Sequence, residues 1–169
     1  METVARDLMI GRATLVFGSG EIASAGNIRV RYTGTTVVSP DVEKASAPLA
    51  TAQANRGVII TCRLAAMNAQ TLAWLFGANS GQIVTDTQRN VRIVRPSASD
   101  PRVDTGVVSL IGRKQNGKEI RIFIPRASIE PGTEEIAFSK SEYTTGTISI
   151  RALDPLDGTD IPYYIEEEL

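Results

Sequence analysis

The chain has 169 residues, a hydrophobic content of 42% and a formal net charge of −1, values typical of one globular domain. It contains no histidine and one cysteine, Cys62, which excludes a Ser-His-Asp triad, a histidine-based zinc site and an intrachain disulfide. No apolar run approaches the roughly 18 residues that a membrane-spanning helix requires. The first residues lack the basic flank and apolar core of a signal peptide. We therefore expect neither a membrane span nor a secretory leader.

The near-neutral total conceals a segregation of charge along the chain. Residues 1–126 carry 16 basic and 9 acidic side chains, a balance of +7, whereas residues 127–169 carry 2 basic and 10 acidic ones, a balance of −8. Three interpretations remain open: the acidic part folds onto its own basic part, it contacts a neighbouring copy, or it is a solvated face. A dedicated nucleic-acid-binding protein is not expected, since such domains usually carry a net basic surface.

The first third of the chain is predicted to hold a short N-terminal arm over residues 1–7, two strands and a long loop. Alternation of apolar and polar residues, which is typical of a half-buried strand, runs through residues 13–17 and 28–33. The first of these runs stops at Gly18-Ser19-Gly20, a turn signal. Residues 39–57 contain two prolines and five alanines without a clear period. Connections of that length in a compact domain are usually functional or disordered.

A strand and a helix are predicted next. In the strand, residues 58–64, Cys62 falls on the inward-alternating side, so we expect it to be an inert core thiol. The helix covers residues 68–77, with Asn68 as N-cap and Gly77 as C-terminal terminator. One face of this helix is expected to pack on a sheet, because so short a helix is unstable alone; it consists of Ala69, Leu72, Leu75 and Phe76. Trp74 points to nearly the opposite side, either as an anchor at a subunit interface or under loops of its own chain.

Strands dominate the remainder of the chain. Residues 91–94 form a short apolar run, followed by an irregular connection over residues 95–106. The clearest hairpin spans residues 107–125, where Asn-Gly predicts a type I′ turn. A last strand pair is expected over residues 135–139 and 145–152, with Ile148 and Ile150 facing one way and Ser149 and Arg151 the other. Residues 154–169 are interpreted as an acidic C-terminal arm, and residues 1–169 as a single domain without an internal linker.

Groupings that could support chemistry are weak. Gly18-Ser19-Gly20 lacks the pattern of a nucleophile elbow and a histidine base. Asp154, Asp157 and Asp160 do not have the spacing of an EF-hand loop. The outward-facing arginines either form a polyanion-binding surface or pair across strands, and we favour pairing; they are Arg29, Arg31, Arg63, Arg121 and Arg151. We therefore predict no catalytic, cofactor-binding or metal-binding residue, no cofactor and no enzymatic activity.

Several stretches resemble the bacteriophage tail tube protein family. Residues 9–17 resemble its first strand, and the strand and single helix of residues 58–77 resemble its strand-then-helix unit. Residues 120–127 and 143–152 resemble its later strands. The likeness is one of pattern over about residues 7–165, and contractile-tail tubes, siphophage tubes and secretion-system tubes share it.

The resemblance implies a mainly β fold: an antiparallel β-sandwich or barrel with one short flanking helix (about 68–77), extended loops and terminal arms. It further implies self-assembly into homohexameric rings, which stack into a virion tail tube with a continuous β-barrel lining the channel. The implied partners are a tape-measure protein, tail terminator and baseplate proteins and, around contractile tubes, a sheath protein. DNA would pass without specific binding during genome ejection, and assembly would take place in the host bacterial cytoplasm.

The long loop of residues 39–57 matches the family segment that reaches an adjoining ring or subunit. The expected subunit-interface residues are accordingly Pro40, Val42, Pro48, Leu49, Trp74, Tyr163 and Tyr164. One alternative is a monomeric β-sandwich that binds carbohydrate or protein, although such modules usually present clustered exposed aromatics. Another is a different virion or secretion-apparatus protein with the same fold.

Overall fold

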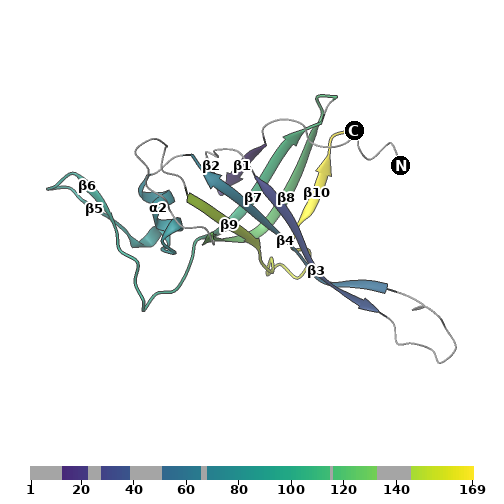
Figure 1. Ribbon diagram of the computed structural model, residues 1–169, viewed down its shortest axis with the longest axis horizontal. Helices are drawn as coiled ribbons and strands as arrows, with labels where there is room; N and C mark the ends of the chain where they lie inside the picture. Colours follow the sequence, from purple (N-terminus) through teal and green to yellow (C-terminus); the bar gives the residue numbers. More distant parts are fainter. Residues whose placement is uncertain (1–12, 23–27, 39–50, 66–67, 115, 133–145) are drawn as a thin grey trace.

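In a computed structural model of the chain, the described residues are 13–22, 28–38, 51–65, 68–114, 116–132 and 146–169. Eight strands form one antiparallel sheet in the order β2-β1-β7-β8-β9-β4-β3, with β10 also beside β8 (Figure 1). Two further strands, β5 and β6, form a separate small sheet, and one short helix, α2, lies between the two sheets (Figure 1).

The bounds of the elements follow the chain order. The strands of the large sheet are β1 (Thr14–Phe17), β2 (Gly20–Ile22), β3 (Arg29–Val38), β4 (Thr51–Leu64), β7 (Thr105–Arg113), β8 (Glu119–Pro131), β9 (Gly146–Ala152) and β10 (Tyr164–Glu167). The remaining elements are helix α2 (Ala69–Leu75), the 3-10 turn η1 (Ser80–Gln82), and strands β5 (Ile83–Asp86) and β6 (Val91–Val94).

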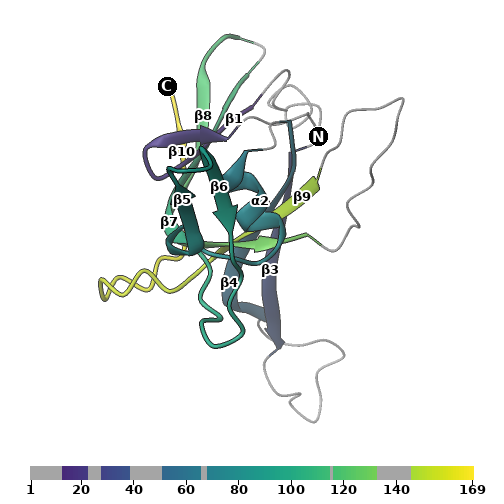
Figure 2. The same cartoon turned by 90° about the vertical axis from the view of Figure 1, so that its left-hand side faces the viewer.

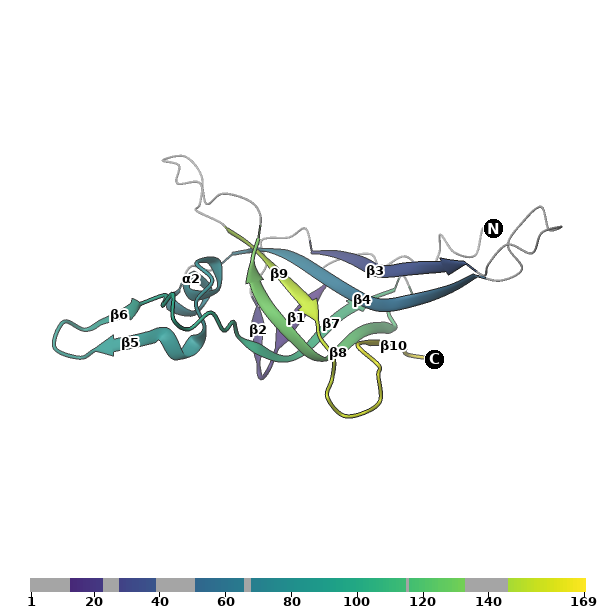
Figure 3. The same cartoon turned by 90° about the horizontal axis from the view of Figure 1, so that it is seen from below.

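The large sheet is strongly curved, so that its two halves face each other around one hydrophobic core (Figure 3). Strand β8 continues through both halves: its first part pairs with β7 and β10, and its last part pairs with β9. The two end strands, β2 and β3, do not pair with each other. The predicted mainly β, antiparallel fold with one short helix is thus confirmed, but one chain does not close a barrel.

The centre of the core is a row of isoleucines that crosses three neighbouring strands. Ile60 of β4 pairs with Ile150 of β9, and Ile150 pairs in turn with Ile129 of β8. All three side chains are at most 1% exposed, whereas Arg151, next to Ile150 along the chain, is exposed. The alternation predicted for residues 145–152 is therefore confirmed from Gly146 onward, because successive side chains of a strand point to opposite faces. Residues 135–139, the predicted partner strand, lie outside the described residues.

Both turn signals of the sequence lie in hairpins, although strand β2, which follows the first of them, is not predicted. Strands β1 and β2 are joined at Gly18, which has a φ of 60°. In the β7–β8 hairpin, however, Lys114 and Lys118 flank the loop: Lys114 N donates to Lys118 O, and Gly117 N donates to Lys114 O. These bonds define a three-residue loop with Gly117 at a φ of 84°, so the two-residue type I′ turn predicted from Asn-Gly is wrong. A three-residue loop commonly places glycine at its left-handed position.

Strands β3 and β4 form a much longer hairpin than the sequence predicts, and it projects from the molecule as an arm (Figure 1). The strands predicted at 28–33 and 58–64 are both present, but residues 51–57, expected within a loop, belong to β4. The pairing shifts between Thr33 and Thr35, opposite Asn55, which has a φ of 52°. This bulge interrupts the alternation of apolar and polar residues, which is why the part of β4 that precedes residue 58 is not recognisable as a strand from the sequence.

Helix α2 begins and ends where predicted, but its buried face differs. Asn68 accepts a hydrogen bond from Thr71 N, and Gly77 follows the last turn with a φ of 71°. Phe76, expected to face the sheet, is 60% exposed, whereas Trp74 is only 8% exposed. The reason is that α2 lies at the end of the sheet, between β8 and β9 on one side and β5 and β6 on another, instead of flat on one surface. None of the helices among the described residues is long and apolar enough to cross a membrane.

Cys62 lies in the core as predicted, with no exposed surface, and burial raises the pKa of its thiol to about 12. At pH 8 the folded chain should therefore react with a thiol-specific reagent at least about a hundredfold more slowly than the chain in denaturant, because the thiolate is the reactive species. Because the unfolded thiol ionises near its ordinary pKa of 9.0, stability should fall as the pH rises above that value. Rapid labelling without denaturant would contradict the buried position.

Candidate assembly surfaces

Trp74 and Asp104 form a hydrogen-bonded junction between helix α2 and the start of β7. The Asp104 carboxylate accepts from Trp74 Nε1 at 2.7 Å and from Gln70 Nε2 at 3.0 Å through one oxygen. Its other oxygen accepts from the backbone N and the hydroxyl of Ser80, at 2.9 and 2.8 Å. The Trp74 ring also packs edge-on against Phe17 of β1, with 5.8 Å between ring centroids.

This arrangement corrects the expectation that Trp74 projects away from the packed side of the helix. The β1–β2 hairpin and Asp104 cover the ring, so the alternative of a tryptophan enclosed by its own chain describes it. With 8% of the residue exposed, little apolar surface remains for a second copy. At the C-terminal end of α2, Phe76 is exposed to solvent instead, with 60% of its surface accessible.

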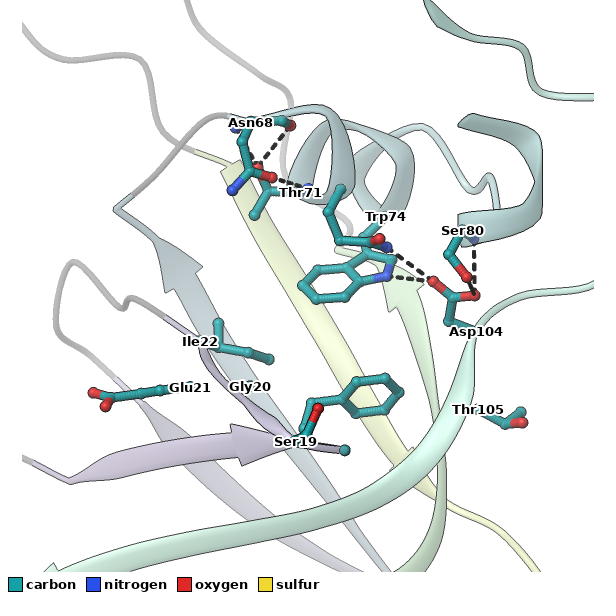
Figure 4. A pocket seen from close by; sticks show the side chains of 13 residues that line it. Ser19, Gly20, Glu21, Ile22, Asn68, Thr71, Trp74, Ser80, Asp104 and Thr105 are labelled. Carbon is teal, nitrogen blue, oxygen red and sulfur yellow. Dashed lines mark hydrogen bonds between the residues drawn. The ribbon is translucent and has the colours of Figure 1, made fainter. Parts of the chain in front are cut away.

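A pocket of about 480 Å³ opens beside this junction, between the β1–β2 hairpin and α2 (Figure 4). Phe17, Trp74 and Ile22 form its apolar walls. Both oxygens of Asp104 already accept two hydrogen bonds each, which uses the acceptor capacity of a carboxylate. The Glu21 carboxylate points away from the Trp74–Asp104 pair (Figure 4). Asp104 is therefore suited to holding the pocket wall together, and the described part of the pocket presents no paired acid and base.

Strand β3 presents an open edge with apolar side chains on the core-facing side. Among the described strands it pairs only with β4, at one end of the large sheet. Val30 and Tyr32 share a face with the buried Ile60 and Val58 opposite them, yet they are 41% and 48% exposed. An edge strand that combines a free hydrogen-bonding edge with apolar surface is a typical site of pairing with another chain.

The C-terminal segment folds back onto the body of its own chain. Tyr164 packs against Phe123 of β8 with 4.9 Å between ring centroids, and Tyr163 packs partly buried against the core. Within β10, Glu166 pairs with Arg121 at 3.6 Å, and Glu167 pairs with Lys114, a lysine only 8% exposed. The part of the predicted arm that contains β10 is therefore a sheet strand, and part of the charge segregation is compensated within the chain.

The predicted pairing of the outward-facing arginines across strands is confirmed for two of the five. Arg121 and Arg151 pair with carboxylates of neighbouring strands, Arg151 with Glu130 at 3.7 Å. Arg29 and Arg31, on β3, have no ion pair with any of the described residues. The face of the sheet around β3 is consequently basic within the part of the chain that the structure describes. The described residues also include no cluster of three or more cysteine, aspartate or glutamate side chains placed to hold a metal.

Strands β5 and β6 form a hairpin that projects from one end of the molecule, beyond α2 (Figures 1 and 2). Only its second strand, at residues 91–94, is predicted from the sequence. Val84 and Val91 on this hairpin are 44% and 38% exposed. The sequence signal that indicates the missed strand is the pair of turn-favouring residues between the two strands, Asp86 and Asn90. In the structure, Asp86 Oδ1 accepts from the backbone N of Arg89, and Asn90 has a φ of 53°.

The predicted interface residues that the structure describes do not share one surface. Pro40, Val42, Pro48 and Leu49 lie outside the described residues. Trp74 is enclosed, and Tyr163 and Tyr164 lie on the C-terminal segment, away from α2. The surfaces that sequence reasoning missed are the exposed core-facing side of β3 and the β5–β6 hairpin. No protein-family model matches the chain, and no curated protein is significantly similar to it.

Proposed function

We propose that the chain is a self-assembling structural subunit of a bacteriophage tail tube. Six copies form a ring, and stacked rings form a tube whose channel conducts the viral genome into the host cell. The tube is assembled in the host cytoplasm around a tape-measure protein and becomes part of the virion. Terminator and baseplate proteins then bind its ends.

The open, curved sheet is the observation that supports this proposal most directly. Within the part of the chain that the structure describes, its end strands β2 and β3 each pair on one side only, and β3 is ten residues long. Curvature sufficient to enclose a core, without closure, leaves two edges that neighbouring copies can pair with. Ring formation removes such edges, which otherwise promote aggregation.

The exposed apolar surface of β3 supports the same conclusion. Val30 is directly opposite Ile60, which has no exposed surface, but Val30 itself is 41% exposed. The hydrophobic face of the sheet therefore continues beyond the region that the described residues cover. A neighbouring sheet placed against β3 would remove this surface from water, with a gain of about 25 cal/mol per Å² of apolar area.

Negative-stain electron microscopy and sedimentation of the purified chain over a range of concentrations test the proposal. We expect rings with a central hole, or stacked tubes, at high concentration. Val30→Lys should abolish them while leaving the far-UV circular dichroism unchanged, because it places a charge on the edge at a position that is already partly exposed.

Val107→Lys is the matched control for this variant. Val107 has nearly the same exposure, 42%, but lies on β7, inside the sheet order. It should still assemble. A chain that stays monomeric under every condition would overturn the proposed function and favour a monomeric carbohydrate- or protein-binding module, which glycan-array binding would then identify.

A further inference from the structure

The β5–β6 hairpin is a two-stranded sheet that projects with little support. Among the described strands, β5 and β6 pair only with each other, and helix α2 contacts both of them. Val84, Ile93 and Val91 share one face, on which the two valines are 44% and 38% exposed. An isolated two-stranded hairpin is only marginally stable in water. An apolar face of this kind is therefore expected to be covered in the functional state.

The same hairpin is basic. Arg89, Arg92 and Arg95 are all exposed, and none of them forms an ion pair with the described residues. The one acidic side chain on the hairpin, Asp86, has an oxygen occupied in the turn, where it accepts from the backbone N of Gln88 and of Arg89. The surface that could cover the hairpin should accordingly be apolar at its centre and acidic around it.

A groove with these properties lies beside the C-terminal segment. It has a volume of about 670 Å³ and runs between the β4 bulge, at Asn55 and Arg56, and the segment that leads into β10. Ile161 and Ile165 line it and are 49% and 60% exposed. This volume lies in the range of pockets that enclose a drug-sized ligand, and so it can accept several side chains of a hairpin tip.

The charge of the groove is complementary to that of the hairpin. Asp154 and Asp160 line it, with Asp157 between them in the same segment. None of the three forms an ion pair with the described residues. Two basic side chains lie at the groove: Arg56 lines it, and Arg126 Nη1 donates to the Asp154 backbone oxygen at 3.1 Å. Against the three aspartates of the segment, the acidic groups remain in excess.

We propose that the β5–β6 hairpin of one copy docks into the C-terminal groove of the next copy. Val84 and Val91 pack against Ile161 and Ile165. Arg89 in the turn and Arg95, which lies two residues beyond Ile93 on the same face, reach the groove aspartates, whereas Arg92 lies on the opposite face of the hairpin. A hairpin cannot reach the groove of its own chain, because it extends from one end of the molecule while the C-terminal segment leaves the sheet beyond the middle (Figures 1 and 3). The contact is head-to-tail, the type that generates rings or filaments; it rests on the proposed self-assembly and identifies one of its interfaces.

Charge reversal tests this contact. Arg89→Glu with Arg95→Glu changes two exposed side chains whose guanidinium groups bond to none of the described residues, so the fold should persist. We expect the dissociation constant for self-association to rise at least about tenfold, because like charges then face each other. Lys118→Glu, an exposed reversal on the β7–β8 turn, should leave association unchanged, and it serves as the control.

A second variant, Asp154→Lys with Asp160→Lys, should show the same loss. Mixing the two reversed variants in equal amounts should restore assembly, because an alternating arrangement pairs every glutamate hairpin with a lysine groove and every native hairpin with a native groove. If the lysine variant does not fold, Asp154→Asn with Asp160→Asn removes the charge, retains the turn hydrogen bond that Asp154 accepts from Leu156 N, and should also weaken association.

The outcomes separate this contact from the proposed function. If the native chain forms no oligomer, the proposed function itself fails. If the native chain forms rings and the Arg89→Glu, Arg95→Glu variant forms them with the same dissociation constant as Lys118→Glu, the hairpin-to-groove contact is wrong, and edge pairing of β3 alone explains assembly.

Discussion

Replacing Asp104 with alanine should lower the free energy of unfolding by about 3 kcal/mol, since a buried donor left without a partner costs about 1–3 kcal/mol and hydrogen bonds to a charged group contribute a similar amount. The carboxylate joins three elements: it accepts from Gln70 and Trp74 of α2 and from Ser80 of η1, and it precedes β7. Chemical denaturation followed by the fluorescence of the only tryptophan measures the loss.

Asp100 offers a matched comparison in the same connection between β6 and β7. Its carboxylate pairs at the surface with Arg102 at 2.7 Å, and hydrogen bonding to Arg102 lowers its pKa to about 2. This pair is present above the ordinary carboxyl pKa of 3.8 and is lost as the pH falls towards 2. Because Arg102 is 81% exposed and the pair is open to solvent, Asp100→Ala should destabilise much less than Asp104→Ala. Equal losses would show that Asp104 does not hold α2 in place.

The strands of the core could be predicted because burial on one face imposes a period of two on the sequence. In β9, Ile148 and Ile150 are fully buried, and the face is determined by the pattern alone. In β3 the same pattern places Val30 and Tyr32 inward but cannot reveal that they are 41% and 48% exposed in the described part of the chain. Alternation indicates the direction of a side chain, whereas its exposure depends on a distant part of the chain.

The buried face of α2 could not be predicted for a related reason. A helical wheel correctly separates Trp74 from Leu72, but the side that is covered depends on what surrounds the helix. Here the β1–β2 hairpin places Phe17 against the Trp74 ring, and the absence of a side chain at Gly146 leaves room for Leu75. Both contacts join residues far apart in the sequence, and no local pattern contains them.

In the folded chain, part of the segregated charge is paired within the chain and part is not. The acidic residues of β10 are compensated locally, Glu166 by Arg121 and Glu167 by Lys114. Asp154 and Asp160, earlier in the same segment, have no such partner among the described residues, and neither have the arginines of the β5–β6 hairpin. The near-neutral total therefore includes two opposite, separated surfaces that one chain cannot bring together, which is the arrangement that head-to-tail association requires.

Replacing Ile150 with alanine should lower the free energy of unfolding by about 3–4 kcal/mol, because truncation of a buried isoleucine loses its transfer free energy and leaves a cavity. Ile150 has no exposed surface and lies between Ile60 and Ile129 in the centre of the row that crosses β4, β9 and β8. Both neighbours belong to paired strands, so the surrounding backbone cannot readily collapse into the space. Equilibrium denaturation of dilute monomer measures the loss.

Ile165→Ala is the control with the same chemical change on another strand. Ile165 lies on β10, is 60% exposed and already contacts water, so its truncation should cost less than about 1 kcal/mol in monomer stability. In assembled material the same substitution should weaken association, because Ile165 lines the C-terminal groove. A large loss of monomer stability at Ile165, or a small one at Ile150, would contradict the placement of the core between the two halves of the curved sheet.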